Sequence, residues 1–273
     1  MITDTASLAH CGKQVRQHVL AMVHRANSSH VGTAFSITDL LSVLFFRVLN
    51  VDPHCPGWKE RDRFILSKGH GAAALYATLA ERGFFPTAWL DTFCLNGGRL
   101  HGHADVHDVP GVDASTGSLG HGLSVGAGMA LAARHDGLGY RVFVLLSDGE
   151  CDEGSVWEAA LFAAHHQLDN LVAIIDYNRL QGLGRVEDVI GLEPLREKWD
   201  AFGWATHEID GHDYAEIENV LSQVPFKPNR PNVVIAHTIK GKGVSFMEDK
   251  LAWHYKSPND EQLRHALNEI GVD

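Results

Sequence analysis

The chain has 273 residues, of which 45% are hydrophobic and 21% charged, enough for one large domain with a substantial core. Its formal net charge of -11, from 34 acidic and 23 basic residues, excludes a general attraction to nucleic acid or to an anionic membrane. The first residues lack a signal-peptide layout and no apolar run approaches the ~18 residues of a membrane span, so we expect a cytoplasmic protein with no nucleic-acid or membrane partner.

The cysteines are widely spaced along the chain. They stand at Cys11, Cys55, Cys94 and Cys151, and no two of them form a C-x-x-C pair. This spacing indicates neither a disulfide framework nor a zinc ribbon. We therefore expect reduced, structural cysteines.

Apolar residues recur at helical spacing in three segments of the first third of the chain, which predicts helices over 7–26, 37–50 and 70–83. Each of these segments closes at a glycine, an asparagine or a polar cluster, as helices commonly do. A last helix is predicted near the C-terminus. Its signals are a capping Ser257, a proline at the first helical position and a closing Gly271.

Short continuous apolar runs are typical of strands that are buried on both faces. Four such runs occur, separated by helical stretches: RFIL at 63–66, RVFVLL at 141–146, LVAIID at 171–176 and NVVIAH at 232–237. Alternating strands and helices predict an α/β fold with a doubly wound, mainly parallel sheet and helices on both faces. No repeat, low-complexity segment or charged linker interrupts the pattern, so we expect one domain over 1–273.

Asp148 and Asn178 each follow one of these strands and stand 30 positions apart, which suits one βαβ step. Because ligands bind at the carboxyl ends of such strands, both side chains are expected at one edge of the sheet. An Asp, an Asn and a nearby backbone carbonyl supply oxygen ligands for Mg²⁺, whose shell phosphate oxygens and water complete. Gly149 would let a backbone N–H approach a phosphate, and a helix beginning near Asp152 would add its positive end. Two ordinary turns are the alternative.

Several of the 18 histidines lie in glycine-rich junctions near the ends of predicted elements. These are His30, His70, His101, His103 and His254. Such histidines can bind diphosphate oxygens, polarise sugar hydroxyls or move protons, because histidine titrates near neutral pH. Zinc binding is the competing interpretation, although no spacing matches H-E-x-x-H or another compact ligand pair.

Seven motifs follow one another along the chain: "NSSHVGT", "LSKGHG", "GHAD", "STGSLGHGLSVGAGMALA", "SDGECDEGSVWEA", "DYNRLQGLG" and "KGKGVSFMEDKLAWH". In order and spacing they resemble the cofactor diphosphate-binding half of the transketolase family. The resemblance spans nearly the whole chain. It implies the thiamine diphosphate-binding fold of that family.

The resemblance also implies roles for particular residues. Asp148, Asn178 and the carbonyl of Leu180 would hold Mg²⁺ or Ca²⁺ against the diphosphate of thiamine diphosphate. The catalytic residues would be His30, His103 and His254, which line the channel and act on the hydroxyls and carbonyl of the ketose and aldose. The residues that contact or surround the cofactor would be Thr33, His70, Gly117, Ser118, Leu119, Gly149, Glu153, Asn178, Lys240 and His254.

Glu153 and Glu158 match acidic residues that face the second active site across the dimer of the family, with a solvated helix face as the alternative. Two positions depart from the family pattern. Ser147 stands where the metal motif usually begins with glycine, and Val31 stands where many members have a proline after the histidine.

The implied reaction moves a two-carbon ketol unit from a ketose donor, expected to be a phosphate, to an aldose acceptor. In the family, a second domain protonates the aminopyrimidine ring of the cofactor and grips the substrate phosphate. This chain has no second set of strands and helices for that domain. We therefore expect the N-terminal subunit of a split transketolase, completed by a C-terminal subunit in an α2β2 assembly that acts on sugars or sugar phosphates.

Two other interpretations stay open. One is a subunit of another two-chain thiamine diphosphate enzyme, such as a 2-oxo acid decarboxylase or dehydrogenase. The row of histidines argues against it, because decarboxylation of an oxo acid needs no sugar-facing groups. The other is a non-catalytic, cofactor-binding subunit of an assembly.

Overall fold

The computed structural model describes residues 5–271. Its strands are β1 (Arg63–Leu66), β2 (Val142–Ser147), β3 (Leu171–Tyr177), β4 (Ala205–Asp210) and β5 (Asn232–His237). Its α-helices are α1 (Thr5–Ala26), α2 (Val31–Ser36), α3 (Thr38–Val43), α4 (Ala72–Arg82), α5 (Gly122–His135), α6 (Gly154–His165), α7 (Val186–Val189), α8 (Leu195–Ala201), α9 (Tyr214–Leu221) and α10 (Asp260–Ile270). A π-turn, η1 (Leu44–Val48), continues α3, and 3₁₀ turns form η2 (Gly69–Gly71), η3 (Thr87–Thr92), η4 (Gly149–Asp152) and η5 (Leu251–His254).

The five strands form one parallel sheet in the order β1-β2-β3-β5-β4. The chain crosses the sheet from β1 to β3, passes on to β4 at the far edge, and then returns to place β5 between β3 and β4. Ligands of open α/β sheets bind outside the carboxyl ends of the strands, near such a reversal of strand order.

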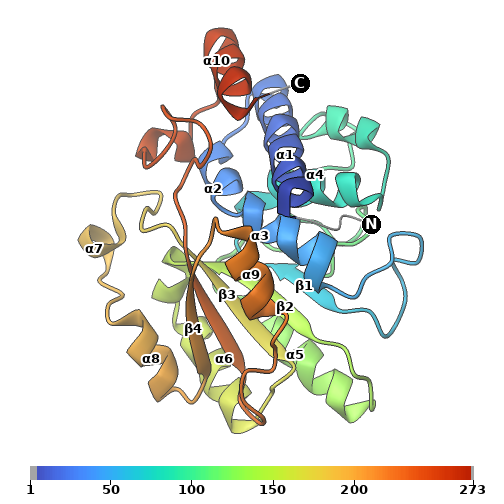
Figure 1. Cartoon of the computed structure of the whole chain (residues 1–273), viewed down its shortest axis with the longest axis vertical. Helices are drawn as coiled ribbons and strands as arrows, with labels where there is room; N and C mark the ends of the chain where they lie inside the picture. The colour runs from blue at the N-terminus through green and yellow to red at the C-terminus, as the bar shows by residue number, and fades with distance from the viewer. Residues whose placement is uncertain (1–4, 272–273) are drawn as a thin grey trace.

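Helices cover both faces of the sheet, as Figure 1 shows. Strand residues alternate between the two hydrophobic clusters: Phe143 and Leu145 of β2 pack with α1, α3, α4 and α9, whereas Val144 and Leu146 pack with α5, α6 and α8. Both faces of each inner strand are therefore buried, which explains the continuous apolar runs. The predicted doubly wound α/β fold is confirmed.

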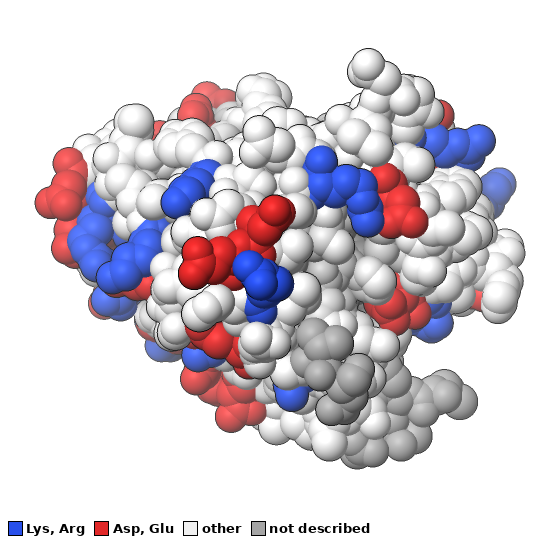
Figure 2. All heavy atoms as spheres, turned by 90° about the horizontal axis from the view of Figure 1, so that it is seen from above, with Lys and Arg blue, Asp and Glu red and all other residues white. Residues whose placement is uncertain are grey.

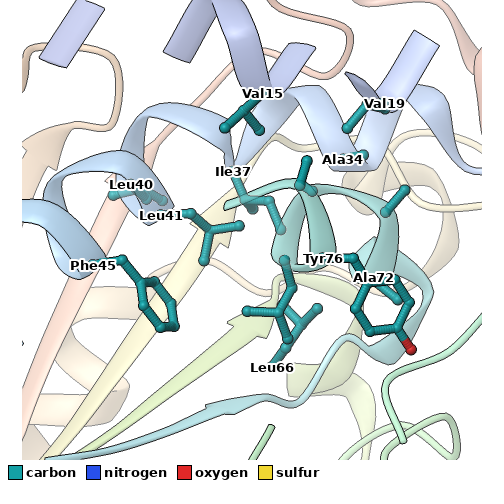
Figure 3. Packing of buried hydrophobic residues seen from close by; sticks show 14 of the residues in the cluster. Val15, Val19, Ala34, Ile37, Leu40, Leu41, Phe45, Leu66, Ala72 and Tyr76 are labelled. Carbon is teal, nitrogen blue, oxygen red and sulfur yellow. The ribbon is translucent and has the colours of Figure 1, made fainter. Parts of the chain in front are cut away.

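The larger cluster lies on the α1 side of the sheet, and Figure 3 shows part of it. Val15 and Val19 of α1 extend into it together with Ile37, Leu66 of β1 and Tyr76 of α4. All five side chains are 2% exposed or less. This packing fixes α2 and η2, which carry Thr33 and His70 of the candidate site, near the end of β1.

The predicted helices and the four predicted strands are confirmed, but sequence reasoning missed β4. Its sequence, ATHEID, contains the exposed residues His207, Glu208 and Asp210. β4 is an edge strand that pairs only with β5 within the described sheet. Because half of its residues are polar and exposed, it lacks the apolar run that identified the other strands, including β1 at the opposite edge.

Two predicted helix starts were wrong. The last helix, α10, is capped by Asn259, which exchanges hydrogen bonds with Gln262 in a capping box, while Ser257 donates to the carbonyl of Val23 instead. Asparagine caps a helix as well as serine does, and the glutamine three residues later completes the box. The helix after β2 begins at Gly154 rather than near Asp152, because η4 comes between them.

All four cysteines are free; Cys11 and Cys151 are buried and the other two are exposed. On the face seen in Figure 2, basic and acidic side chains stand beside one another and form no continuous basic area. No helix within residues 5–271 has the length and apolar character needed to cross a membrane.

Candidate functional site

A cavity of about 320 Å³ opens where β2, β3 and β5 end. Segments far apart in the sequence line it, because parallel strands bring their carboxyl ends to one edge. Thirteen of the residues singled out by the sequence are in its wall: His30, Thr33, His70, His103, Gly117, Leu119, Ser147, Asp148, Gly149, Asn178, Leu180, Lys240 and His254. Ser118, Glu153, Glu158 and His101 are exposed and lie outside the wall.

Asp148 and Asn178 lie at the floor of the cavity, side by side on paired strands. Asp148 is only 2% exposed, and its two oxygens accept hydrogen bonds from the backbone N–H groups of Gly149 (2.8 Å) and Arg179 (2.6 Å). Burial, together with the charge of Asp176, raises the pKa of Asp148 to about 6. No cationic side chain pairs with this carboxylate in the part of the chain that the structure describes.

Asp176, at the end of β3, orients the amide of Asn178. It forms a fully buried ion pair with Lys68 and also accepts hydrogen bonds from the hydroxyls of Ser36 and Thr238. The amide nitrogen of Asn178 donates to the same carboxylate over 2.9 Å. Burial alone would raise the pKa of Asp176, but the charge and hydrogen bond of Lys68 lower it overall. The amide oxygen of Asn178 accepts a hydrogen bond from the backbone N–H of Leu180 over 3.1 Å.

Lys240 connects the floor to the histidines above it. Its ammonium group donates to the carbonyl oxygen of Leu180 over 2.6 Å and to Nδ1 of His254 over 2.8 Å. Burial and the charge of Lys68 lower the pKa of Lys240 to about 8, so it remains mostly charged at neutral pH. Because Nδ1 of His254 accepts this hydrogen bond, the ring proton of a neutral His254 lies on Nε2.

Four histidine rings form a cluster in the cavity wall, with His30 at its centre. The centroid of the His30 ring lies 5.2 Å from that of His70, 6.2 Å from that of His103 and 5.1 Å from that of His254. The backbone N–H of His30 also donates to the carbonyl of His254 over 2.9 Å. His30 has a left-handed φ of 77°, a conformation that is uncommon for a side-chain-bearing residue and often marks a functional site.

Three rings of the cluster, those of His30, His70 and His254, are neutral rather than protonated at neutral pH. Burial, with positive charge on neighbouring groups, lowers the pKa of His30 to about 4 and that of His254 to about 3. The pKa of His70 is also well below its ordinary value, mainly because of burial. The expectation of titration near neutral pH is therefore wrong for these three rings, because burial penalises the charged form. They can still donate and accept hydrogen bonds.

The loop from Gly117 to Gly120 is held to the sheet by Glu150, a fully buried residue that sequence reasoning did not single out. One oxygen of Glu150 accepts from the hydroxyl of Ser67 (2.6 Å) and the N–H of Gly120 (2.9 Å), and the other accepts from the N–H of Ser147 (3.0 Å). One carboxylate thus joins this loop to the ends of β1 and β2.

Three further residues line the cavity and were missed from the sequence: Gln181, Gly182 and Tyr255. Each lies within two positions of a predicted residue, Leu180 or His254, which was the available signal. Gln181 donates to Asp152 and lies against Gly149, where a Cβ atom would come within 3.3 Å of its side chain. Within residues 5–271, no cluster of three or more His, Cys, Asp or Glu side chains is arranged to hold a metal ion, so the zinc interpretation has no such cluster to support it.

Comparisons with known proteins bear on this site. Residues 8–273 match the family model "Transketolase, thiamine diphosphate binding domain". The chain is 44% identical over 270 residues to 6-deoxy-6-sulfo-D-fructose transketolase subunit SqwG of Clostridium sp. (strain MSTE9), covering 99% of this chain and 98% of that protein. It is 43% identical over 255 residues to one subunit of the apulose-4-phosphate transketolase of Phocaeicola vulgatus, covering 93% of this chain and 90% of that subunit.

Among solved structures, the transketolase from Leishmania mexicana superposes with a TM-score of 0.93 at 28% sequence identity. The match covers 99% of this chain but 42% of that one. The chain therefore spans less than half of that protein, whereas it spans nearly the full length of the Clostridium and Phocaeicola subunits.

Proposed function

This chain belongs to the transketolase family, and we propose that it is the thiamine diphosphate-binding subunit of a two-subunit transketolase. The observation that carries the proposal is a charged, buried floor with oxygen ligands that lies in the same cavity as a cluster of four histidine rings. Similarity over nearly the full length to proteins named as transketolase subunits supports it. The substrates would be ketose donors and aldose acceptors that carry a phosphate or a similar anionic group.

The floor fits a divalent metal and a diphosphate. Asp148 supplies a buried carboxylate without a cationic partner among the described residues, and Asn178 and the carbonyl of Leu180 supply neutral oxygens. Mg²⁺ and Ca²⁺ prefer such oxygen ligands. The carbonyl of Leu180 already accepts a hydrogen bond from a cationic group, the ammonium of Lys240. These three residues would therefore hold Mg²⁺ or Ca²⁺ at the diphosphate.

Groups around the floor would complete the diphosphate site. Lys240 brings positive charge, and Thr33 and His70 line the same wall. Gly149 contributes mainly room, because its N–H donates to Asp148. The loop of Gly117, Ser118 and Leu119 would lie beside the thiamine rings, held there by Glu150.

When bound, thiamine diphosphate supplies the electron sink for breaking the carbon–carbon bond of the ketose. The histidines of the chain position the sugar and move its protons. His254 would donate its Nε2–H to a sugar oxygen, and His30 and His103 would donate to or accept from the hydroxyls and carbonyl nearby. The neutral rings of His30 and His254 suit hydrogen bonding to the sugar, because a neutral imidazole offers one donor and one acceptor and buries no charge.

Partner subunits would complete each site. We propose an assembly with two copies of this chain and two of a complementary C-terminal subunit, which would bind the aminopyrimidine ring and the substrate's anionic end. The exposed Glu153 and Glu158 would face the second active site of that assembly. Glu153 lies beside the loop at Gly120, and its exposure there leaves it accessible to a partner chain.

Mixing the purified subunits tests the proposed function. A coupled aldehyde assay should detect two-carbon transfer in the mixture, with little or no transfer by this chain alone. The reason is that a cofactor held only at its diphosphate end is poorly oriented, and fixed geometry supplies much of the rate enhancement. Robust turnover by this chain alone, at a rate that the partner does not improve, would contradict the two-subunit proposal.

A further inference from the structure

Tyr255 lies at the mouth of the cavity and has no part in the function proposed above. It follows η5, lines the cavity next to His254, and remains 62% exposed. Its ring centroid lies 4.6 Å from that of His254, at an interplanar angle of 61°. Across residues 5–271, no hydrogen bond engages its hydroxyl group.

Gly182 has no side chain, and this leaves room for the hydroxyl group of Tyr255 on the cavity wall. A Cβ atom at Gly182 would come within 2.6 Å of the hydroxyl oxygen of Tyr255 and 3.2 Å of Nε2 of His254. These two polar atoms therefore flank the same point of the wall. Nε2 carries the ring proton of His254, so an N–H donor and a phenol hydroxyl border one region of the cavity.

The exposed fractions of the cavity residues indicate which part of a bound sugar reaches Tyr255. Asp148 and Lys240 at the floor are each 2% exposed, His30, His70 and His254 are partly exposed, and Tyr255 is 62% exposed. A sugar whose reacting carbons lie at the histidines would extend the rest of its chain toward solvent. There it would meet an aromatic ring with a free polar tip, a combination that suits a partly hydrated ligand.

Resting on the transketolase activity proposed above, we propose that Tyr255 is a specificity-determining residue whose hydroxyl binds a hydroxyl of the sugar chain beyond the reacting carbons. Gly182 keeps the space for this contact open. Ketose donors with a long hydroxylated chain would use the contact. Donors without such a chain would not.

The test compares donors in the reconstituted two-subunit enzyme. The long donor is whichever of fructose 6-phosphate, xylulose 5-phosphate and 6-deoxy-6-sulfofructose reacts fastest, and the short donor is hydroxypyruvate, which carries the two-carbon unit without a sugar chain. Tyr255→Phe removes one uncharged hydrogen bond, so kcat/KM for the long donor should fall by about 2- to 10-fold. The values for hydroxypyruvate and the affinity for thiamine diphosphate should not change.

Two further variants sharpen the result. Gly182→Ala should displace the Tyr255 hydroxyl and lower kcat/KM more for the long donor than for hydroxypyruvate, which shares only the closer approach of the new Cβ to Nε2 of His254. Leu251→Ala alters an exposed side chain of the same turn outside the cavity wall, and should behave as wild type with both donors. An unchanged long-donor kcat/KM in Tyr255→Phe, or an equal loss with both donors, would overturn the inference. A wild-type mixture that transfers from neither donor would instead overturn the proposed function.

Discussion

At the floor of the cavity, Asp148, Asp176 and Lys240 keep most of their charge at neutral pH although each is at most 2% exposed. The histidines above them are also substantially buried, yet His30, His70 and His254 have lowered pKa values and stay neutral. The ion pair with Lys68 stabilises the charge of Asp176, whereas burial and positive neighbours disfavour a charge on the three histidines. A floor of this kind suits a metal and a diphosphate, and a neutral wall suits sugar hydroxyls.

The largest expected effect would come from the wall. His103→Ala or His254→Ala should lower kcat of the reconstituted enzyme by about 10²- to 10⁴-fold, the usual contribution of a group that transfers protons. The affinity for thiamine diphosphate should change far less. Steady-state kinetics and calorimetry measure the two quantities.

His101→Ala is the matched control, because His101 is two positions away, exposed and outside the cavity wall. It should leave kcat unchanged. Loss of cofactor affinity without loss of kcat in the His103 and His254 variants would mean that these residues support the structure of the site. The floor and the wall would then not differ in function.

The stability of the protein should depend more on the buried ion pair at the floor than on an exposed ion pair. Asp176→Asn leaves the buried ammonium of Lys68 without its counter-charge, so the free energy of unfolding should fall by about 3–5 kcal/mol. Denaturant unfolding measures it. Asp249→Asn, which breaks an exposed pair with Arg185, should have a much smaller effect, because solvent screens that pair. Equal effects of the two substitutions would mean that burial of the floor pair is energetically unimportant.

The smallest expected effect is that the rings of His30 and His254 do not titrate near neutral pH. The ring signals of His30 and His254 in NMR spectra should stay constant from about pH 8 to pH 5.5, because their pKa values are about 4 and about 3. An unfolded chain binds these protons near the ordinary value of 6.5, so the two rings make the free energy of unfolding fall as pH drops below that value. A titration of either ring centred near pH 6.5 would contradict the claim that these histidines, unlike the floor residues, avoid charge.

Much of the fold was predictable because inner strands are buried on both faces. The runs that became β2 and β3 are continuous and apolar for that reason, and β4 was missed because an edge strand exposes part of one face. The start of α10 depended on choosing between Ser257 and Asn259 as the cap, two residue types that serve equally well.

The candidate site was predictable where function is carried by short local motifs, as at Asp148 and the residues after it. The supporting contacts were not, because they join residues distant in the sequence. Asp176 binds Lys68, 108 positions away, and Glu150 binds Ser67, 83 positions away. No local pattern indicates such pairs. The lowered pKa values of the histidines likewise depend on burial, which the sequence does not specify.

The division of labour between floor and wall can be tested most directly by calorimetric titration of thiamine diphosphate, with and without Mg²⁺. Wild type and His254→Ala should both bind the cofactor more tightly with Mg²⁺, whereas Asp148→Ala and Asn178→Ala should each lose that dependence and weaken binding by more than about 100-fold. This magnitude exceeds the 10- to 100-fold that loss of a group supporting a metal ligand costs. Unchanged, Mg²⁺-dependent affinity in both Asp148→Ala and Asn178→Ala would contradict the account.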